Sequence, residues 1–292
     1  MTAVEPTNYD RTDGQTWVDQ IPWDQFEPDK VDPEQLKTVK AAALVEFNAQ
    51  DYATYLSQVF PDDEDFKQAA WHWAQEEVLH GIALGRWAKL ADPGFDFEAA
   101  IRRFRAGFSL PLDATESVRG SRAGELVARC IVEVGTSSFY TAFGQAMPEP
   151  VFRKICQRIA ADEFRHYKLF YKHLKRYLER DRIGRLRRLK IAFGRIAESE
   201  DDELAYAYYA GNTDGSLPYD RKTWSSAYMR RAFQLYRREH VDRAMAMTMK
   251  AAGLDPQGRL ATLGSGLAYW YLRRRRERLA RGAEPPVVPT AA

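Results

Sequence analysis

The feature that most constrains the fold is a pair of Glu-x-x-His steps, each preceded by a single glutamate about one helical hairpin upstream. The steps are Glu77/His80 and Glu163/His166. Glu46 lies 31 residues before Glu77, and Glu133 lies 30 residues before Glu163. Residues three apart share one face of a helix, so each step presents a carboxylate and an imidazole to the same point.

Two single-glutamate helices and two Glu-x-x-His helices form the ligand set of ferritin-like di-iron carboxylate bundles. The spacing therefore predicts an all-α, ferritin-like four-helix bundle that holds two iron ions, with manganese in one site as an alternative. His80 and His166 each supply one nitrogen. Glu77 and Glu163 are natural bridging ligands and Glu46 and Glu133 are terminal or bridging, but spacing leaves the bridging roles open.

A purely structural interpretation competes with this one. Four inward carboxylates are costly without a cation, because buried charges must be compensated. Salt bridges to Arg103, Arg129 or Arg165 would provide that compensation in the absence of metal. The chain has only five histidines, and two of them fall in these steps on helix-patterned segments, which favours the metal site.

Composition is that of an ordinary globular protein, with 292 residues, 45 % hydrophobic and 29 % charged. No segment reaches the roughly 20 apolar residues of a membrane span. The first residues lack the pattern of a signal peptide, so we expect a cytoplasmic protein. Cys130 and Cys156 are too few and too far apart for a disulfide framework, and we expect both to be core residues.

Apolar periodicity and helix-breaking residues divide the chain into four parts. These are a polar N-terminal arm (1–31), the bundle (32–180), a C-terminal helical extension (181–282) and a disordered tail (283–292). The first bundle helix starts at an Asp32 cap and continues through Glu46 to Pro61. The extension should contain about four helices.

The remaining three bundle helices are also bounded by clear signals. The second follows the acidic cluster at Asp62 and stops at Asp92, and a short crossover helix lies near residues 96–108. The third carries Glu133 and is broken at residues 147–150, and the fourth ends near Arg180. Short connections within each pair and a longer one between the pairs match a bundle with a crossover.

Several residues beside the steps are candidates for supporting roles. Thr136, one turn after Glu133, would face the cluster and donate a proton or hydrogen bond, or simply bond back to its own helix. Asp162 would accept a hydrogen bond from a ligand imidazole. Glu76 points about 100° away from Glu77, so it belongs to the surface or to the shell around the ligands. His72, His173 and His240 have core or surface roles.

The segments WAQEEVLHG (73–81) and IAADEFRHYKLF (159–170) resemble the metal-binding helices of soluble acyl-ACP desaturases. The resemblance covers residues 36–180, and around Glu133 it keeps little beyond that glutamate and Thr136. It implies a di-iron oxidoreductase that uses O2 to desaturate a long acyl chain on acyl carrier protein. It also implies that Thr136 lies beside the oxygen site, and that Asp162 links a ligand histidine to a tryptophan, Trp17 or Trp23.

The same resemblance implies a ferredoxin-type electron donor and a homodimer. Acyl carrier protein is acidic, and charge is unevenly distributed here, with 20 acidic against 7 basic side chains in residues 1–100 and the reverse balance after them. The basic stretches 172–195 and 273–276 are candidate docking surfaces, although the second also suits a membrane-surface helix. We expect no nucleic-acid partner, because no RNA-binding motif accompanies the arginines.

Other functions share this ligand set. Hydroxylation and aldehyde deformylation remain open, and a tRNA-modifying hydroxylase is a weaker alternative. Arylamine N-oxygenases generally add a histidine where this chain has Ile159, and rubrerythrin-type peroxidases have a Cys-x-x-Cys module that it lacks. A non-catalytic iron-binding or storage protein is the contrasting class, and the hundred residues after the bundle argue against a storage cage.

Overall fold

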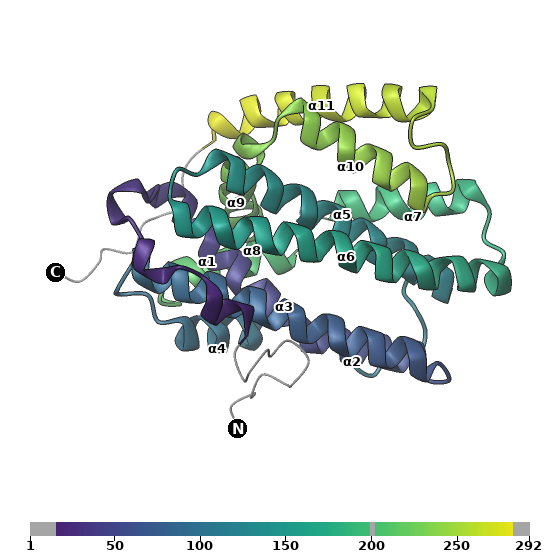
Figure 1. Cartoon of the computed structure of the whole chain (residues 1–292), viewed down its shortest axis with the longest axis horizontal. Coiled ribbons are helices and arrows are strands. Elements are labelled where there is room, and N and C mark those ends of the chain that lie inside the picture. Colours follow the sequence, from purple (N-terminus) through teal and green to yellow (C-terminus); the bar gives the residue numbers. More distant parts are fainter. Residues whose placement is uncertain (1–15, 199–201, 283–292) are drawn as a thin grey trace.

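The computed structural model describes residues 16–198 and 202–282, and all regular structure in these ranges is helical, which confirms the predicted all-α class (Figure 1). Three short 3-10 helices precede the first α-helix. The α-helices are α1 (Pro33–Phe47), α2 (Ala49–Val59), α3 (Glu64–Ala91), α4 (Phe97–Gly107), α5 (Arg122–Ala146), α6 (Pro150–Asp181), α7 (Arg185–Ala197), α8 (Asp202–Asn212), α9 (Arg221–Leu235), α10 (Arg238–Ala251) and α11 (Arg259–Ala280).

The long helices α3, α5 and α6 and the shorter α1 form the centre of the molecule. Helix α5 packs along α6, α1 packs along α3, and α3 contacts α6 (Figure 1). These helices begin and end close to the predicted signals: α3 stops before Asp92, and α5 ends before the segment 147–150. Four helices from two halves of the chain therefore meet, as the repeated Glu-x-x-His pattern predicts.

The C-terminal part contains five helices within its described residues, one more than the sequence indicates. Helix α8 packs on α1, α7 and α10 pack on α5, and α11 lies along α9 and α10 at the outside of the molecule (Figure 1). Buried residues of α8 and α9, such as Tyr208 and Trp224, belong to the same hydrophobic core as α1, α3, α5 and α6. The extension is thus packed into the bundle.

The prediction of one continuous helix from Asp32 to Pro61 is wrong, because the chain breaks at Asn48 between α1 and α2. The Asn48 amide donates to Asp51 (3.1 Å) and its oxygen accepts from Arg105 (3.0 Å). Asparagine is a weak helix former whose side chain competes for local hydrogen bonds. The break falls two residues after Glu46, so it changes the direction of the chain beside the site.

A glycine on α3 allows α1 to approach closely at the same level. A Cβ atom on Gly81 would lie 2.6 Å from the backbone nitrogen of Phe47 and 2.7 Å from its Cβ. Both distances are shorter than real Cβ atoms tolerate, so a larger residue here would force the helices apart. Gly81 follows His80 directly, and its small size therefore keeps Glu46 near that imidazole.

The N-terminal arm is more deeply buried than its polar sequence indicates. From residue 16 onward it forms the 3-10 turns Trp17–Gln20, Trp23–Gln25 and Pro28–Lys30. Trp17, Val18 and Ile21 are buried in the main core. The arm therefore covers one side of the bundle, while residues 1–15 and the predicted disordered tail at 283–292 lie outside the described residues.

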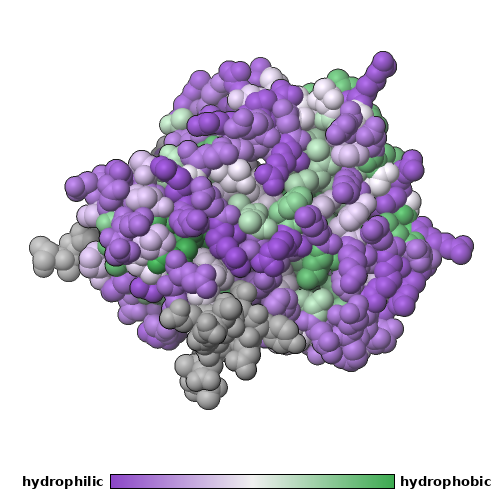
Figure 2. Space-filling model, in the orientation of Figure 1, coloured by the Kyte–Doolittle hydropathy of each residue, from purple (hydrophilic) through white to green (hydrophobic). Residues whose placement is uncertain are grey.

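The surface carries no membrane-spanning signal. In the described ranges, no helix combines the length and the hydrophobicity that crossing a bilayer needs. The face in Figure 2 is mostly hydrophilic, with hydrophobic residues in small separate areas. Cys130 and Cys156 are buried free thiols, as expected of core residues.

Asp63 links the start of α3 to the end of α6. Its carboxylate caps α3 by accepting from the Phe66 backbone N–H (3.1 Å), and it also accepts from Tyr177 and Arg176, both at 2.6 Å. Burial opposes its ionisation, but the hydrogen bonds from Tyr177 and Phe66 and the charge of Arg176 outweigh it and lower the pKa of Asp63. This contact fastens the two hairpins at the end remote from the N-terminal arm.

We expect Asp63→Asn to reduce the free energy of unfolding at pH 7 by about 1.5–3 kcal/mol, the usual value of hydrogen bonds to charged groups. Because the folded-state pKa is depressed, this stability is present above the unfolded pKa of about 3.9 and is lost as the pH falls through the folded value. Urea unfolding of the metal-free variant and wild type should therefore differ at pH 7, and the difference should shrink as the pH falls below about 3.9. The exposed neighbour Glu64→Gln is the control, and an equal loss at every pH would contradict the prediction.

Candidate metal centre

The six predicted ligands converge in the middle of the bundle. Helix α1 contributes one residue, α5 one, and α3 and α6 two each, and none is more than 7 % exposed. In chain order they are Glu46, Glu77, His80, Glu133, Glu163 and His166. Glutamate is almost never buried without compensation, so four buried glutamates at one point require a cation or protons.

The six residues form two overlapping groups that could each hold a metal ion. One consists of Glu46, Glu77, His80 and Glu163, and the other of Glu77, Glu133, Glu163 and His166. Within each group the ligand atoms all lie within 4.8 Å of one another. Glu77 and Glu163 belong to both groups, which is the position that bridging carboxylates require.

Both imidazoles turn the same nitrogen toward the carboxylates. Nδ1 of His80 lies 3.0 Å from Glu77 and 3.3 Å from Glu163. Nδ1 of His166 lies 3.0 Å from Glu77 and 3.8 Å from Glu133. The two rings are 5.8 Å apart between centroids. Each group thus has one nitrogen ligand, and this equivalence supports a site for two ions.

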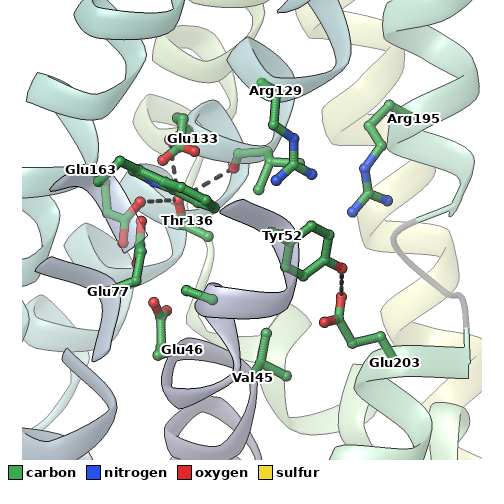
Figure 3. A pocket seen from close by; sticks show the side chains of 13 residues that line it. Val45, Glu46, Tyr52, Glu77, Arg129, Glu133, Thr136, Glu163, Arg195 and Glu203 are labelled. Carbon is green, nitrogen blue, oxygen red and sulfur yellow. Dashed lines mark hydrogen bonds between the residues drawn. The ribbon is translucent and has the colours of Figure 1, made fainter. Parts of the chain in front are cut away.

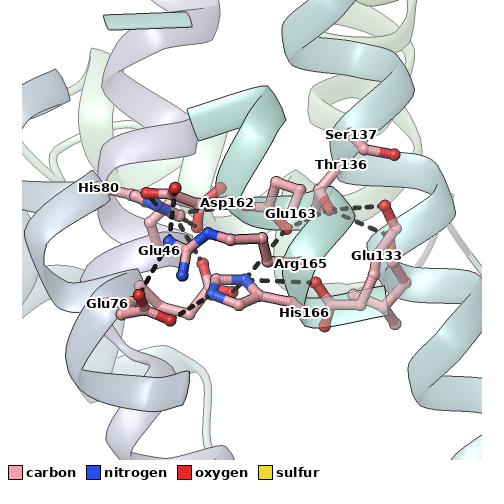
Figure 4. A network of polar contacts seen from close by, with 12 residues as sticks. Glu46, Glu76, His80, Glu133, Thr136, Ser137, Asp162, Glu163, Arg165 and His166 are labelled. Atoms are coloured by element: carbon pink, nitrogen blue, oxygen red, sulfur yellow. Dashed lines mark hydrogen bonds and ion pairs between the residues drawn. The ribbon is translucent and has the colours of Figure 1, made fainter. Parts of the chain in front are cut away.

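The outer nitrogens of the two imidazoles bind carboxylates in a crossed arrangement (Figure 4). Nε2 of His80, on α3, lies 3.3 Å from Asp162 on α6. Nε2 of His166, on α6, lies 2.9 Å from Glu76 on α3. Each acidic residue directly precedes the glutamate of its own step, so it points about 100° away from that step and reaches the opposite helix. Such partners fix the orientation of ligand imidazoles.

Arg165 joins the two outer carboxylates. Its guanidinium donates to Asp162 (2.6 Å) and to Glu76 (2.9 Å), and Arg158 adds a further hydrogen bond to Asp162 (3.0 Å) (Figure 4). Burial opposes ionisation of Asp162, but hydrogen bonds from His80 and Arg165 lower its pKa to about 2. These two outer carboxylates are therefore ionised and paired with arginine, so they do not compete with the inner carboxylates for a cation.

The inner carboxylates divide into two pairs with opposite pKa shifts. Burial and the charges of Glu77 and Glu163 raise the pKa of Glu46 and Glu133. Burial acts in the same direction on Glu77 and Glu163, but the imidazoles more than offset it and lower the pKa of both. For His166, burial is outweighed by the surrounding carboxylates, which raise its pKa. Without metal, close repulsion between the carboxylates must be relieved by protons.

The donor set fits metal ions. Among the described residues, both carboxylate oxygens of Glu133, Oε1 of Glu163 and Nδ1 of His166 are buried and make no hydrogen bond of suitable geometry, although the last two lie within ion-pair distance of His80 and Glu77. Unpaired buried acceptors are costly, and these four atoms face the interior of the cluster. Oxygen and imidazole nitrogen are ligands of iron and manganese, and four carboxylates neutralise two divalent ions.

Thr136 and Tyr140 hold two of the carboxylates from α5. The Thr136 hydroxyl donates to Glu163 at 2.6 Å, with longer contacts of 3.3 Å to the carbonyls of Val132 and Glu133. Thr136 thus faces the cluster and also contacts its own helix. The two alternatives predicted for its hydroxyl, donation into the cluster and bonding back to the helix, therefore each describe part of its position. The buried Tyr140 hydroxyl donates to Glu46 at 2.5 Å. The sequence placed Tyr140 on the inner face of this helix without assigning it to the site.

Of the two candidate tryptophans, Trp17 lies at the site. Its ring packs edge-on against His80, with 6.1 Å between centroids, and Arg158 lies over it at 5.6 Å. Trp17 reaches Asp162 only through Arg158, which binds both. Trp23 instead contacts Arg86 and donates to the carbonyl of Val18. The geometry therefore favours Trp17 for the link that the resemblance implies.

A small cavity of about 60 Å³ adjoins the cluster (Figure 3). Glu46, Glu77, Glu133 and Glu163 lie at its inner end together with Thr136. Its other walls include Val45 and Val132 and the polar side chains Tyr52, Arg129, Arg195 and Glu203. Because glutamates of both groups line it, a small molecule entering the cavity meets the carboxylates of both groups.

The competing salt-bridge interpretation is wrong for the described residues. Arg165 pairs with Glu76 and Asp162, Arg103 donates to the carbonyl of Ala210, and Arg129 forms no ion pair. Glu76 is buried, so the surface alternative for it is also wrong; it lies beside the ligands, where it contacts Nε2 of His166. His72, His173 and His240 belong to neither metal group.

The sequence signal for Glu76 was present as a repeat. Both steps read acid-Glu-x-x-His, with Glu76 in one and Asp162 in the other. Their crossed partners depend on how α3 and α6 pack, which the repeat alone does not give.

Comparison with known proteins adds nothing to this geometry: neither a family model nor a curated protein matches the chain. The resemblance to acyl-ACP desaturases therefore rests on the residues themselves.

We expect Glu163→Ala to remove at least one of the two metal ions, because Glu163 belongs to both groups. Metal content by plasma mass spectrometry, after loading with ferrous iron and with manganese, measures the effect and the metal preference. Exposed Glu179→Ala, at the end of the same helix, is the matched control and should bind as wild type does. Full loading of the Glu163 variant would contradict the ligand assignment.

Proposed function

We propose that this protein is a ferritin-like di-iron oxidoreductase that uses O2. The observation that carries the proposal is the pair of buried groups sharing Glu77 and Glu163, each with one inward-facing imidazole. A carboxylate-rich pair of ions held this way supplies the binding of O2 and its reduction by two electrons at a time. Manganese in one position is the alternative composition.

The side chains around the cluster have separable roles in this proposal. Glu76, Asp162 and Arg165 keep both imidazoles turned with Nδ1 inward, so the nitrogen ligands are in place before metal binds. Tyr140 fixes Glu46. Thr136 holds a proton 2.6 Å from Glu163 at the edge of the cavity, where it is available to a reacting oxygen.

For the substrate, the resemblance favours a long acyl chain on acyl carrier protein, desaturated with electrons from a ferredoxin-type donor. The cavity bears on this choice, because ligand pockets usually enclose about 300–1,000 Å³ and this one encloses about 60 Å³. A long chain would require the helices around the cavity to separate. The small size of the cavity favours a second candidate, hydroxylation or N-oxygenation of a small molecule by the same centre.

The basic surfaces are candidate sites for acidic partners. Lys172 and Lys175 are exposed on α6, and Arg273 and Arg274 are exposed on α11. Arg276 is less suited to docking, because it donates to the carbonyls of Phe233 and Tyr236 and thereby holds α11 to the end of α9. The stretch on α6 is therefore the better candidate for binding a carrier protein or an electron donor.

Mass spectrometry of acyl carrier protein loaded with saturated chains tests the first substrate. The carrier is incubated with iron-loaded protein, O2 and a reductant. Loss of two hydrogens would identify a desaturase, and gain of one oxygen a hydroxylase. No change in any chain, despite bound iron and consumption of O2, would eliminate the acyl-carrier substrate and leave the small-molecule candidate.

We expect Thr136→Val to leave metal content unchanged and to lower product formation per O2 consumed by about a hundredfold or more, the usual range for a lost proton donor. Oxygen uptake and released hydrogen peroxide measure the uncoupling. Thr141→Val is the matched control, because Thr141 lies on the same helix and bonds only to the Ser137 carbonyl. Loss of metal in the Thr136 variant would show that its role is structural.

A further inference from the structure

Arg129 is a buried cation without a hydrogen-bond acceptor. It is 6 % exposed, and its Nε is enclosed and has no partner. No hydrogen bond or ion pair involves its terminal nitrogens within residues 16–198 and 202–282. A guanidinium stays charged and carries five N–H donors, and the enclosed Nε–H of Arg129 at least is unpaired, which is unfavourable in a protein interior.

Two aromatic rings pack against this guanidinium, but they do not accept hydrogen bonds from its N–H groups. Its central carbon lies 4.8 Å from the centroid of Tyr52 and 5.9 Å from that of Trp73. Rings attract a cation through their faces but accept no strong hydrogen bond from its N–H groups. The Tyr52 hydroxyl is already engaged, since it donates to Glu203 at 2.7 Å. The arginine is thus fixed in the cavity wall with donors turned toward the cavity (Figure 3).

Neutralisation of the carboxylate cluster does not explain Arg129. The inner carboxylates contact His80, His166, Thr136 and Tyr140, and none of them pairs with this arginine. A guanidinium placed to balance buried carboxylates is expected to bind at least one of them directly, because the fork of N–H donors matches a carboxylate. Here it remains separate, on the cavity side.

We propose that Arg129 binds the carboxylate of a small substrate and positions that substrate at the metal centre. The inference rests on the proposed function, since it names the substrate class of the same site. Arg129 precedes Glu133 by four residues on α5, so the two residues share one helix face and their Cα atoms lie about 6 Å apart along the helix axis. A carboxylate bound to Arg129 would therefore keep the rest of the substrate in the cavity that the four glutamates also line.

The size and lining of the cavity agree with a short substrate. It encloses about 60 Å³, and its lining includes the apolar side chains of Val45, Ala49 and Val132. A planar carboxylate can accept two parallel hydrogen bonds from the guanidinium. The substrate class is thus a small monocarboxylate whose oxidisable group lies near the acid.

Isothermal titration calorimetry with butyrate and benzoate tests the proposal, with butyramide and benzamide as neutral matches. Wild type, Arg129→Gln, Arg129→Lys and the exposed-site control Arg102→Gln are titrated both metal-free and metal-loaded. We expect wild type and the Arg102 control to bind a carboxylate at least about tenfold more tightly than its amide. Arg129→Gln should abolish this preference, and Arg129→Lys should retain part of it because it keeps the charge but not the fork.

Metal content and circular dichroism of each variant separate this proposal from the proposed function. If wild type takes up no metal yet prefers carboxylates through Arg129, the anion site stands and the di-iron function fails. If metal loads fully but carboxylate affinity is the same in Arg129→Gln, the inference is overturned while the function stands. Tighter binding of inorganic phosphate than of either carboxylate would also overturn it. Arg129→Lys provides the test if the glutamine variant fails to fold.

Discussion

The mutual repulsion of four buried carboxylates is the constraint on which the rest of this structure depends. Glu46, Glu77, Glu133 and Glu163 are each at most 7 % exposed and come from four different helices. Bringing them together costs free energy that only cations or protons can offset. Burial and this repulsion raise the pKa of Glu133, whereas for Glu77 the imidazole of His166 outweighs burial and lowers the pKa. Both oxygens of Glu133 also lack a hydrogen bond among the described residues, so its charge is the least compensated of the four.

Two sets of surrounding side chains, one inside the other, stabilise the carboxylates and the imidazoles. Close to the cluster, Thr136 and Tyr140 each donate to one carboxylate, and the imidazoles face inward. Outside, Glu76 and Asp162 cross between α3 and α6 and are tied together by Arg165. Because each outer acid orients the histidine of the opposite helix, the positions of the two ligand helices are coupled. Displacement of either helix would disturb both nitrogen ligands.

Much of the fold could be predicted from local signals, and the errors arise where contacts between different helices decide the outcome. The capping Asp63 and the break after Ala146 set helix ends at the predicted places. The interruption at Asn48 was missed, because it depends on Arg105 from α4 and on the close approach at Gly81. Arg129 was weighed only as a counter-ion, since the rings that hold it come from α2 and α3.

The sequence by itself determined the helical class and the six residues that meet at the centre, because helix periodicity places residues three apart on one face. Tertiary structure alone decided which acid binds which imidazole, that Trp17 rather than Trp23 lies at the site, and that Arg129 faces the cavity unpaired. These contacts join helices distant in sequence. Their geometry follows from how the helices pack, which local periodicity does not specify.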